Sequence, residues 1–198
     1  MNDEVLSLFD ARKGHFRFES GHHGDLWLDI PPAYVRPDRV RRFAKELAAK
    51  LGPHRVEAIC GPLVEGALLA QMVAEELDVE FYFSEQFTRS ANDGLYPIGY
   101  RIPAALRPGV RGKRIAVVDE VINAGSAVRG AIEDLKTCGA QLVAIGSLMT
   151  LGDRASKIAA AEGIPLETLA RIATSNLWEA ASCPVCAAGE PLEGDPSP

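Results

Sequence analysis

The alternation of short apolar runs with helical patterns is the feature that most constrains how this chain can fold. Two successive units show it, with segments at 56–60, 64–77 and 79–85 in the first unit and at 115–119, about 126–138 and 141–151 in the second. Runs that are apolar throughout are typical of strands buried on both faces. Because right-handed crossovers place the intervening helices on both sides of such strands, we predict an α/β fold, a three-layer sandwich with a central parallel sheet.

A helix is predicted ahead of these units, over residues 37–51. Its apolar residues recur at helical spacing, and they are Val40, Phe43, Ala44, Leu47, Ala48 and Leu51. Pro37 suits the first turn of a helix, and Gly52-Pro53 supplies a stop. The pattern indicates an amphipathic helix with one buried face.

The length of the chain favours a single domain. Its 198 residues, of which 47% are hydrophobic, suffice for one well-buried core and are few for two. We expect one domain over residues 1–188. The N-terminal part, mainly residues 14–30, does not fit the repeated unit and predicts a small extra layer over one edge of the sheet. The tail, residues 189–198, is rich in proline and acidic residues and is expected to be disordered.

Charge and hydropathy exclude two classes of partner. The 21 Lys and Arg residues against 27 Asp and Glu give a net charge of -6, which argues against binding to nucleic acid. No apolar stretch approaches the roughly 18 residues of a membrane span, and the first residues, MNDEVLSLFD, lack the pattern of a secretory signal. We therefore expect no membrane partner and a cytoplasmic protein.

The segment 115–135 carries the clearest chemistry. A buried strand is followed by two adjacent carboxylates, Asp119 and Glu120, at the sheet edge where α/β proteins bind ligands. Small residues then lead into a helix: Asn123, Ala124, Gly125, Ser126 and Ala127. Backbone N–H groups at a helix start bind phosphate, and Ser126 is expected to cap the helix and to offer its hydroxyl. Carboxylates beside a phosphate cradle fit a ligand that also has vicinal hydroxyls, such as ribose 5-phosphate.

A purely structural interpretation exists for the same residues. Many strands end in Asp, and many helices begin with Gly and Ser because the turn requires them. The apolar strand before Asp119 and the well-formed helix after Ser126 favour the ligand-binding interpretation.

At this point three motifs resemble a known family. The stretch 117–129, VVDEVINAGSAVR, resembles the phosphoribosyl-pyrophosphate signature of type I phosphoribosyltransferases, in a variant similar to that of the orotate enzymes. Residues 14–29 resemble the N-terminal hood of the orotate enzymes, and residues 59–70 resemble their pyrophosphate loop. The motifs occur in the same order over about residues 13–154.

The resemblance implies a function and a set of site residues. It implies a Mg²⁺-dependent enzyme, expected as a homodimer, that transfers the phosphoribosyl group of 5-phosphoribosyl-1-pyrophosphate to a nucleobase, with orotate as the indicated base. Asp119 and Glu120 would hold the ribose hydroxyls, and residues 123–127 would wrap the 5-phosphate. The pyrophosphate would lie over Gly61, Pro62, Leu63, Val64, Glu65 and Gly66.

The stretch 83–94 departs from the family. Orotate enzymes usually have lysines and a histidine there that neutralise the departing pyrophosphate, whereas FSEQFTRSANDG contains neither and offers Arg89 as its cation. Arg154 is either the cation for the carboxylate of the base or a surface residue of a helix. Glu19 would repel an anionic base. The alternation of Tyr96, Ile98, Tyr100 and Ile102 predicts a half-buried arm over 95–103.

These departures leave two alternatives open. The first is a regulatory protein that binds phosphoribosyl pyrophosphate or a nucleotide with weak or no turnover, and the second is a transferase for another base.

The four cysteines do not form a disulfide framework. Cys60 and Cys138 lie in apolar stretches and are expected in the core, while Cys183 and Cys186 form one C-x-x-C motif. That motif supplies half of a tetrahedral zinc site, which one or two of His15, His22, His23 and His54 could complete. Our default expectation is an inert pair, so no metal ligand is assigned. The nearby Leu177-Trp178 is expected to dock the tail on the body of the protein.

Overall fold

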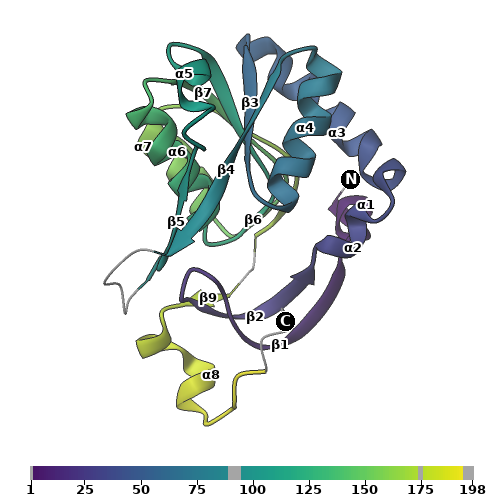
Figure 1. Cartoon of the computed structure of the whole chain (residues 1–198). Coiled ribbons are helices and arrows are strands. Elements are labelled where there is room, and N and C mark those ends of the chain that lie inside the picture. The colour runs from purple at the N-terminus through teal and green to yellow at the C-terminus, as the bar shows by residue number, and fades with distance from the viewer. Residues whose placement is uncertain (1, 89–94, 174–175, 194–198) are drawn as a thin grey trace.

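The computed structural model describes residues 2–88, 95–173 and 176–193. A six-stranded sheet forms its centre, in the order β5-β4-β3-β6-β7-β8. The strands are β3 (Ala58–Pro62), β4 (Glu80–Thr88), β5 (Ile98–Arg101), β6 (Arg114–Ile122), β7 (Gln141–Leu151) and β8 (Leu166–Ile172). All neighbouring pairs are parallel except β4 and β5. The predicted α/β fold with a central parallel sheet is confirmed (Figure 1).

Helices cover both faces of this sheet. The longer ones are α3 (Pro37–Leu51), α4 (Glu65–Leu77), α6 (Ser126–Thr137) and α7 (Arg154–Glu162), and the shorter ones are α1 (Asn2–Leu6), α2 (Pro31–Tyr34), α5 (Arg107–Val110) and the 3-10 helix η1 (Gly52–His54). Strand β6 shows why two cores form, since alternate side chains of a strand point to opposite faces. Ala116 and Val118 pack with α3 and α4, while Ile115 and Val117 pack with α6 and α7.

The predicted helix over 37–51 is confirmed with the same bounds. All six residues at the expected positions are buried, and Pro37 is the first helical residue. The prediction of strand ends is less accurate. Strand β6 continues to Ile122 and therefore contains Asp119 and Glu120 instead of ending at them.

A second, three-stranded antiparallel sheet forms the hood. It consists of β1 (Asp10–Arg17), β2 (His23–Asp29) and β9 (Leu177–Trp178), in that order. The hood is larger than the expected layer at 14–30, since β1 begins at Asp10 and the C-terminal part of the chain adds β9. The docking of Leu177-Trp178 is confirmed, and its partners are Gly24 and His23 of β2. In Figure 1 the hood lies below the central sheet, on the side toward which β6 runs.

The C-terminal segment lies against the side of the hood that faces away from the central sheet (Figure 1). It contains the 3-10 helix η2 (Ala180–Ser182) and the short helix α8 (Pro184–Ala187). After α8, the backbone N–H of Glu193 donates to the carbonyl of His15 on β1 at 2.8 Å. The division into a domain at 1–188 and a tail stays a prediction, and residues 194–198 lie outside the described residues.

None of the helices in the described ranges has both the length and the apolar character needed to span a bilayer.

Candidate functional site

The carboxylate pair lies where the central sheet opens. The pairing of β6 with β7 continues to Ile122, whereas its pairing with β3 ends at Val117. The strands that follow β3 in the chain, β4 and β5, lie toward one edge of the sheet. The strands that follow β6, which are β7 and β8, lie toward the other edge. Asp119 and Glu120 therefore occupy the topological switch point, where ligands of α/β sheets bind.

Both carboxylates are buried and close to each other. Asp119 is 7% exposed and Glu120 is 8% exposed. Burial raises the pKa of Glu120 to about 6, and burial together with the charge of Glu120 raises the pKa of Asp119. The Oε2 atom of Glu120 has no hydrogen-bond partner within the described part of the chain. A buried carboxylate oxygen without a donor indicates a site prepared for hydroxyl groups or a cation from outside.

The Gly61–Gly66 loop packs directly on this pair. A Cβ atom on Gly66 would lie 2.5 Å from Oδ1 of Asp119, and one on Gly61 would overlap the carbonyl group of Gly66. Glycine at 66 therefore lets the start of α4 approach Asp119 on β6, and glycine at 61 lets it approach β3. Within the loop, Pro62 ends β3, the Leu63 N–H donates to the Ser84 carbonyl at 2.9 Å, the Leu63–Val64 peptide bond is cis, and Glu65 begins α4.

The loop at 123–127 joins β6 to α6, as expected, but Ser126 does not cap the helix. Gly125 is the N-cap residue, with a φ of 75° in the left-handed region, and it makes no side-chain cap. Ser126 is consequently the first helical residue, and its hydroxyl donates to Glu19 at 3.4 Å. Neighbouring Ala124 is buried, and Asn123 and Ala127 are partly buried.

Glu19 brings a third carboxylate to this place from the hood. It accepts hydrogen bonds from Tyr100 Oη at 3.0 Å and from Gln86 Nε2 at 3.1 Å, in addition to Ser126. Burial and the charge of Glu19 raise the pKa of Tyr100. Glu19 therefore lies beside the start of α6, and its predicted repulsion of an anionic base stays a prediction.

Arg154 lies at a junction of the hood, the arm and α7. Its Nη1 donates to Tyr96 Oη at 3.4 Å, and the Tyr96 N–H donates to the carbonyl of Ser20 in the hood at 2.8 Å. The guanidinium of Arg129 lies 4.6 Å from the Tyr96 ring centre. Beside this junction is a cavity of about 720 Å³, lined by Tyr96, Ser126, Arg129 and Arg154 among others. Arg154 is therefore not a plain surface residue, although its role in binding a base stays a prediction.

His22, which the sequence offers only as a candidate zinc ligand, belongs to the same junction. It is fully buried, its Nδ1 lies 3.1 Å from Ser20 Oγ, and its ring centre lies 5.6 Å from that of Tyr96. Its Nε2 has no partner among the described atoms. Burial and the charge of Arg154 lower the pKa of His22. The contact between His22 and Tyr96 could not be predicted from local sequence, because the fold brings them together from the hood and the arm.

The arm at 95–103 is partly as predicted. Tyr100 and Ile102 are buried, and β5 pairs with β4. Tyr96 falls outside the expected strand, since its φ of 61° lies in the left-handed region and β5 begins at Ile98. Arg89, the cation expected in the preceding stretch, lies outside the described residues.

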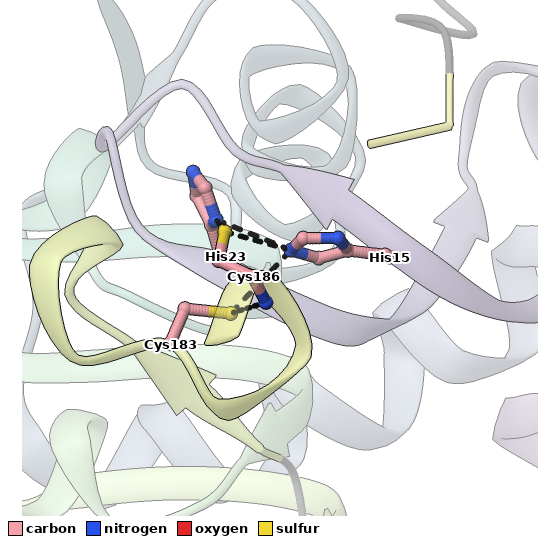
Figure 2. A group of neighbouring side chains, drawn as sticks. All are labelled: His15, His23, Cys183 and Cys186. Carbon is pink, nitrogen blue, oxygen red and sulfur yellow. Dashed lines mark hydrogen bonds between the residues drawn. The ribbon is translucent and has the colours of Figure 1, made fainter. Parts of the chain in front are cut away.

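The cysteines fall into the two expected groups. Cys60 and Cys138 are buried in the core, and all four thiols are free of disulfides. The pair Cys183 and Cys186 does not stand alone, because it lies against His15 and His23 of the hood (Figure 2).

Known proteins resemble this chain along nearly its whole length. The phosphoribosyl transferase domain family matches residues 34–185. The orotate phosphoribosyltransferase of Caldanaerobacter subterraneus is 29% identical over 96% of this chain and 94% of its own length, and that of Thermotoga maritima is 30% identical over 98% and 96%.

Solved structures share the fold. The orotate phosphoribosyltransferase of Aeropyrum pernix superposes with a TM-score of 0.61 at 21% identity, covering 84% of this chain and 89% of its own. The adenine phosphoribosyl transferase of Trypanosoma brucei, in complex with AMP, pyrophosphate and ribose-5-phosphate, gives 0.66 at 17% identity, covering 85% and 78%. With a family match over more than half of its residues and a full-length relative at 30% identity, the chain belongs to the phosphoribosyltransferase family.

Proposed function

We propose that this protein transfers the phosphoribosyl group of 5-phosphoribosyl-1-pyrophosphate to orotate. The observation that carries the proposal is the buried pair Asp119 and Glu120 at the sheet opening, flanked by the 61–66 loop and the 123–127 loop. The names of the relatives support orotate as the base.

Each part of the donor has a matching group in the chain. The ribose hydroxyls donate to Asp119 and Glu120, whose spare oxygen then gains a partner. The 5-phosphate binds the backbone N–H groups at the start of α6, where Gly125 leaves room for its oxygens. The pyrophosphate lies over residues 61–66. Fixing the donor in this way orients the anomeric carbon toward the base.

The same carboxylates also favour the reaction electrostatically. Positive charge develops on the ribose as the bond to pyrophosphate breaks, and two carboxylates in a buried site stabilise that charge more strongly than water does. The rest of catalysis is the positioning of the base nitrogen for attack.

Mg²⁺ fits this site, since the carboxylates of Asp119 and Glu120 are oxygen donors of the kind it prefers and Oε2 of Glu120 has no partner among the described atoms. When bound with the donor, Mg²⁺ neutralises the charge of the leaving pyrophosphate.

Orotate carries a carboxylate that needs a cation. Arg154 supplies it in this proposal, with Tyr96 Oη accepting a hydrogen bond from the guanidinium and the His22 ring packing edge-on against Tyr96.

A second candidate is binding of the donor without efficient turnover. It is favoured by the contact of Glu19 with Ser126 and by the absence of Lys and His from 83–94.

A turnover assay separates the candidates. Orotidine 5′-phosphate formed from orotate, with loss of the product in Asp119→Asn, supports the enzyme. Binding of the donor without product from orotate, uracil, adenine or guanine supports the binding protein. Product from a base other than orotate supports a transferase for another base.

We propose a cytoplasmic homodimer. Four thiols without disulfides suit a reducing compartment. Exposed Val64 and Leu68, one turn apart on the loop and α4, offer an apolar contact for a second copy. Light scattering with size-exclusion chromatography would give twice the mass of 21.3 kDa for a dimer, and a single-chain mass would contradict it.

A further inference from the structure

Four side chains from both ends of the chain meet on the outer side of the hood. They are His15 of β1, His23 of β2, and Cys183 and Cys186 at the start of α8, and Figure 2 shows their nitrogen and sulfur atoms directed at one another. One ligand atom from each lies within 4.8 Å of all the others. His15, His23 and Cys183 are buried, with exposed fractions of 4%, 6% and 3%, and Cys186 is exposed.

Four of the six separations between the ligand atoms are close to those around a tetrahedral zinc ion. Nε2 of His15 lies 3.2 Å from Nδ1 of His23, 3.4 Å from Sγ of Cys183 and 3.6 Å from Sγ of Cys186, and the last sulfur lies 3.2 Å from Nδ1 of His23. Zn–S bonds of about 2.3 Å and Zn–N bonds of about 2.0–2.1 Å place tetrahedral ligand atoms about 3.3–3.8 Å apart.

Contacts outside the four ligand atoms hold them in the form a metal requires. The Nδ1 of His15 lies 3.0 Å from the carbonyl of Glu190, so this nitrogen carries the proton and Nε2 presents its lone pair to the cluster. The N–H of Cys186 donates to Sγ of Cys183 at 3.5 Å, which stabilises a thiolate.

The geometry of β1 explains how the adjacent residues His15 and Phe16 can both be buried. His15 and Phe16 point to opposite faces of β1, and a register shift between Lys13 and Phe16 adjusts the strand at this point. Phe16 packs on Trp27, while His15 faces the C-terminal segment.

We propose that His15, His23, Cys183 and Cys186 bind one Zn²⁺ that fastens the C-terminal segment to the hood. Two thiolates and two imidazoles in a tetrahedral arrangement select zinc, and they leave no open position, so the site is structural. It is separate from the oxygen-rich site at Asp119 and does not rest on the proposed function. His23 directly follows His22, so the ion would also fix the hood turn that reaches the candidate active site.

Metal analysis of the whole protein tests the proposal without any variant. Protein purified without chelator should contain one zinc per chain. Reduced protein stripped of metal should take up one Co²⁺ and show the visible absorption of a tetrahedral site with thiolate ligands. Removal of the metal should also make the segment 179–193 sensitive to limited proteolysis, and Zn²⁺ should restore its protection.

Matched variants identify the ligands. Cys183→Ser with Cys186→Ser should lose the zinc, whereas Cys138→Ala, which alters a core thiol, and His54→Gln, which alters a histidine paired with Glu167, should each keep one zinc per chain.

Three results would overturn the proposal. They are a protein that holds no zinc and takes up no Co²⁺ when reduced, a double cysteine variant with undiminished zinc, and a segment 179–193 that resists proteolysis equally with and without metal.

Discussion

The Glu120→Gln substitution should stabilise the ligand-free protein at neutral pH while it weakens function. In the native protein burial raises the pKa of Glu120 from 4.5 to about 6. A raised pKa means that the contribution of this group to stability is full below about pH 4.5 and is lost as the pH rises through about 6. The difference between these pKa values corresponds to about 2 kcal/mol, because each pH unit is worth about 1.4 kcal/mol.

Glutamine has nearly the same shape and no charge, so the variant avoids this loss. We expect its stability relative to the natural protein to rise by about 2 kcal/mol between roughly pH 4 and pH 7.5, which is about 4–8 °C in Tm for a chain of this size. Urea unfolding without Mg²⁺ or substrate, followed across this range, measures the difference. Glu75→Gln, at an exposed position of α4, is the control and should show no such trend. Parallel pH curves for the natural protein and Glu120→Gln would refute the reasoning.

Three other substitutions test separate parts of the site. Glu19→Gln removes a negative charge beside the phosphate loop, so calorimetry should show donor binding tighter by about 1 kcal/mol, or roughly fivefold, and weaker binding would mean that Glu19 helps to hold the donor. Arg154→Met should raise the KM for orotate by roughly 10- to 100-fold, because a hydrogen bond to a charged group contributes that much binding free energy. Lys157→Met on the same helix should leave the KM unchanged, and equal effects of the two substitutions would show that Arg154 does not bind the base. Gly125→Ala forces a side chain into the left-handed region and against Ile158, so thermal unfolding should show a loss of about 1–2 kcal/mol or more, and an unchanged Tm would contradict the required turn.

The architecture follows largely from local patterns. The helical spacing from Val40 to Leu51 predicts α3 with its observed bounds, and the apolar runs predict the parallel strands. Strand ends are harder to predict, because β6 continues as far as β7 offers hydrogen bonds, and the paired residues of β7 lie 27 or 28 positions further along the sequence.

The candidate site divides in the same way. The positions of Asp119, Glu120 and Gly125 are visible in the sequence because a strand, a turn and a helix follow one another within about 20 residues. The contacts of Glu19 and His22 are not visible in the sequence, since their partners Ser126, Tyr100 and Tyr96 come from distant segments.

The cluster at the hood shows the limit most clearly. The C-x-x-C motif is apparent in the sequence, but four histidines could complete it. The pairing of β9 with β2 brings His15 and His23 to the cysteines, while His22 lies at Tyr96 and His54 pairs with Glu167.

Calorimetric titration with phosphoribosyl pyrophosphate in the presence of Mg²⁺ tests the central claim most directly. We predict saturable binding of one donor per chain, and its loss in a folded Asp119→Asn, Glu120→Gln double variant, because both acceptors of the ribose hydroxyls are then gone. Unchanged binding in the double variant, or no binding to the natural protein, would contradict the assignment of this site.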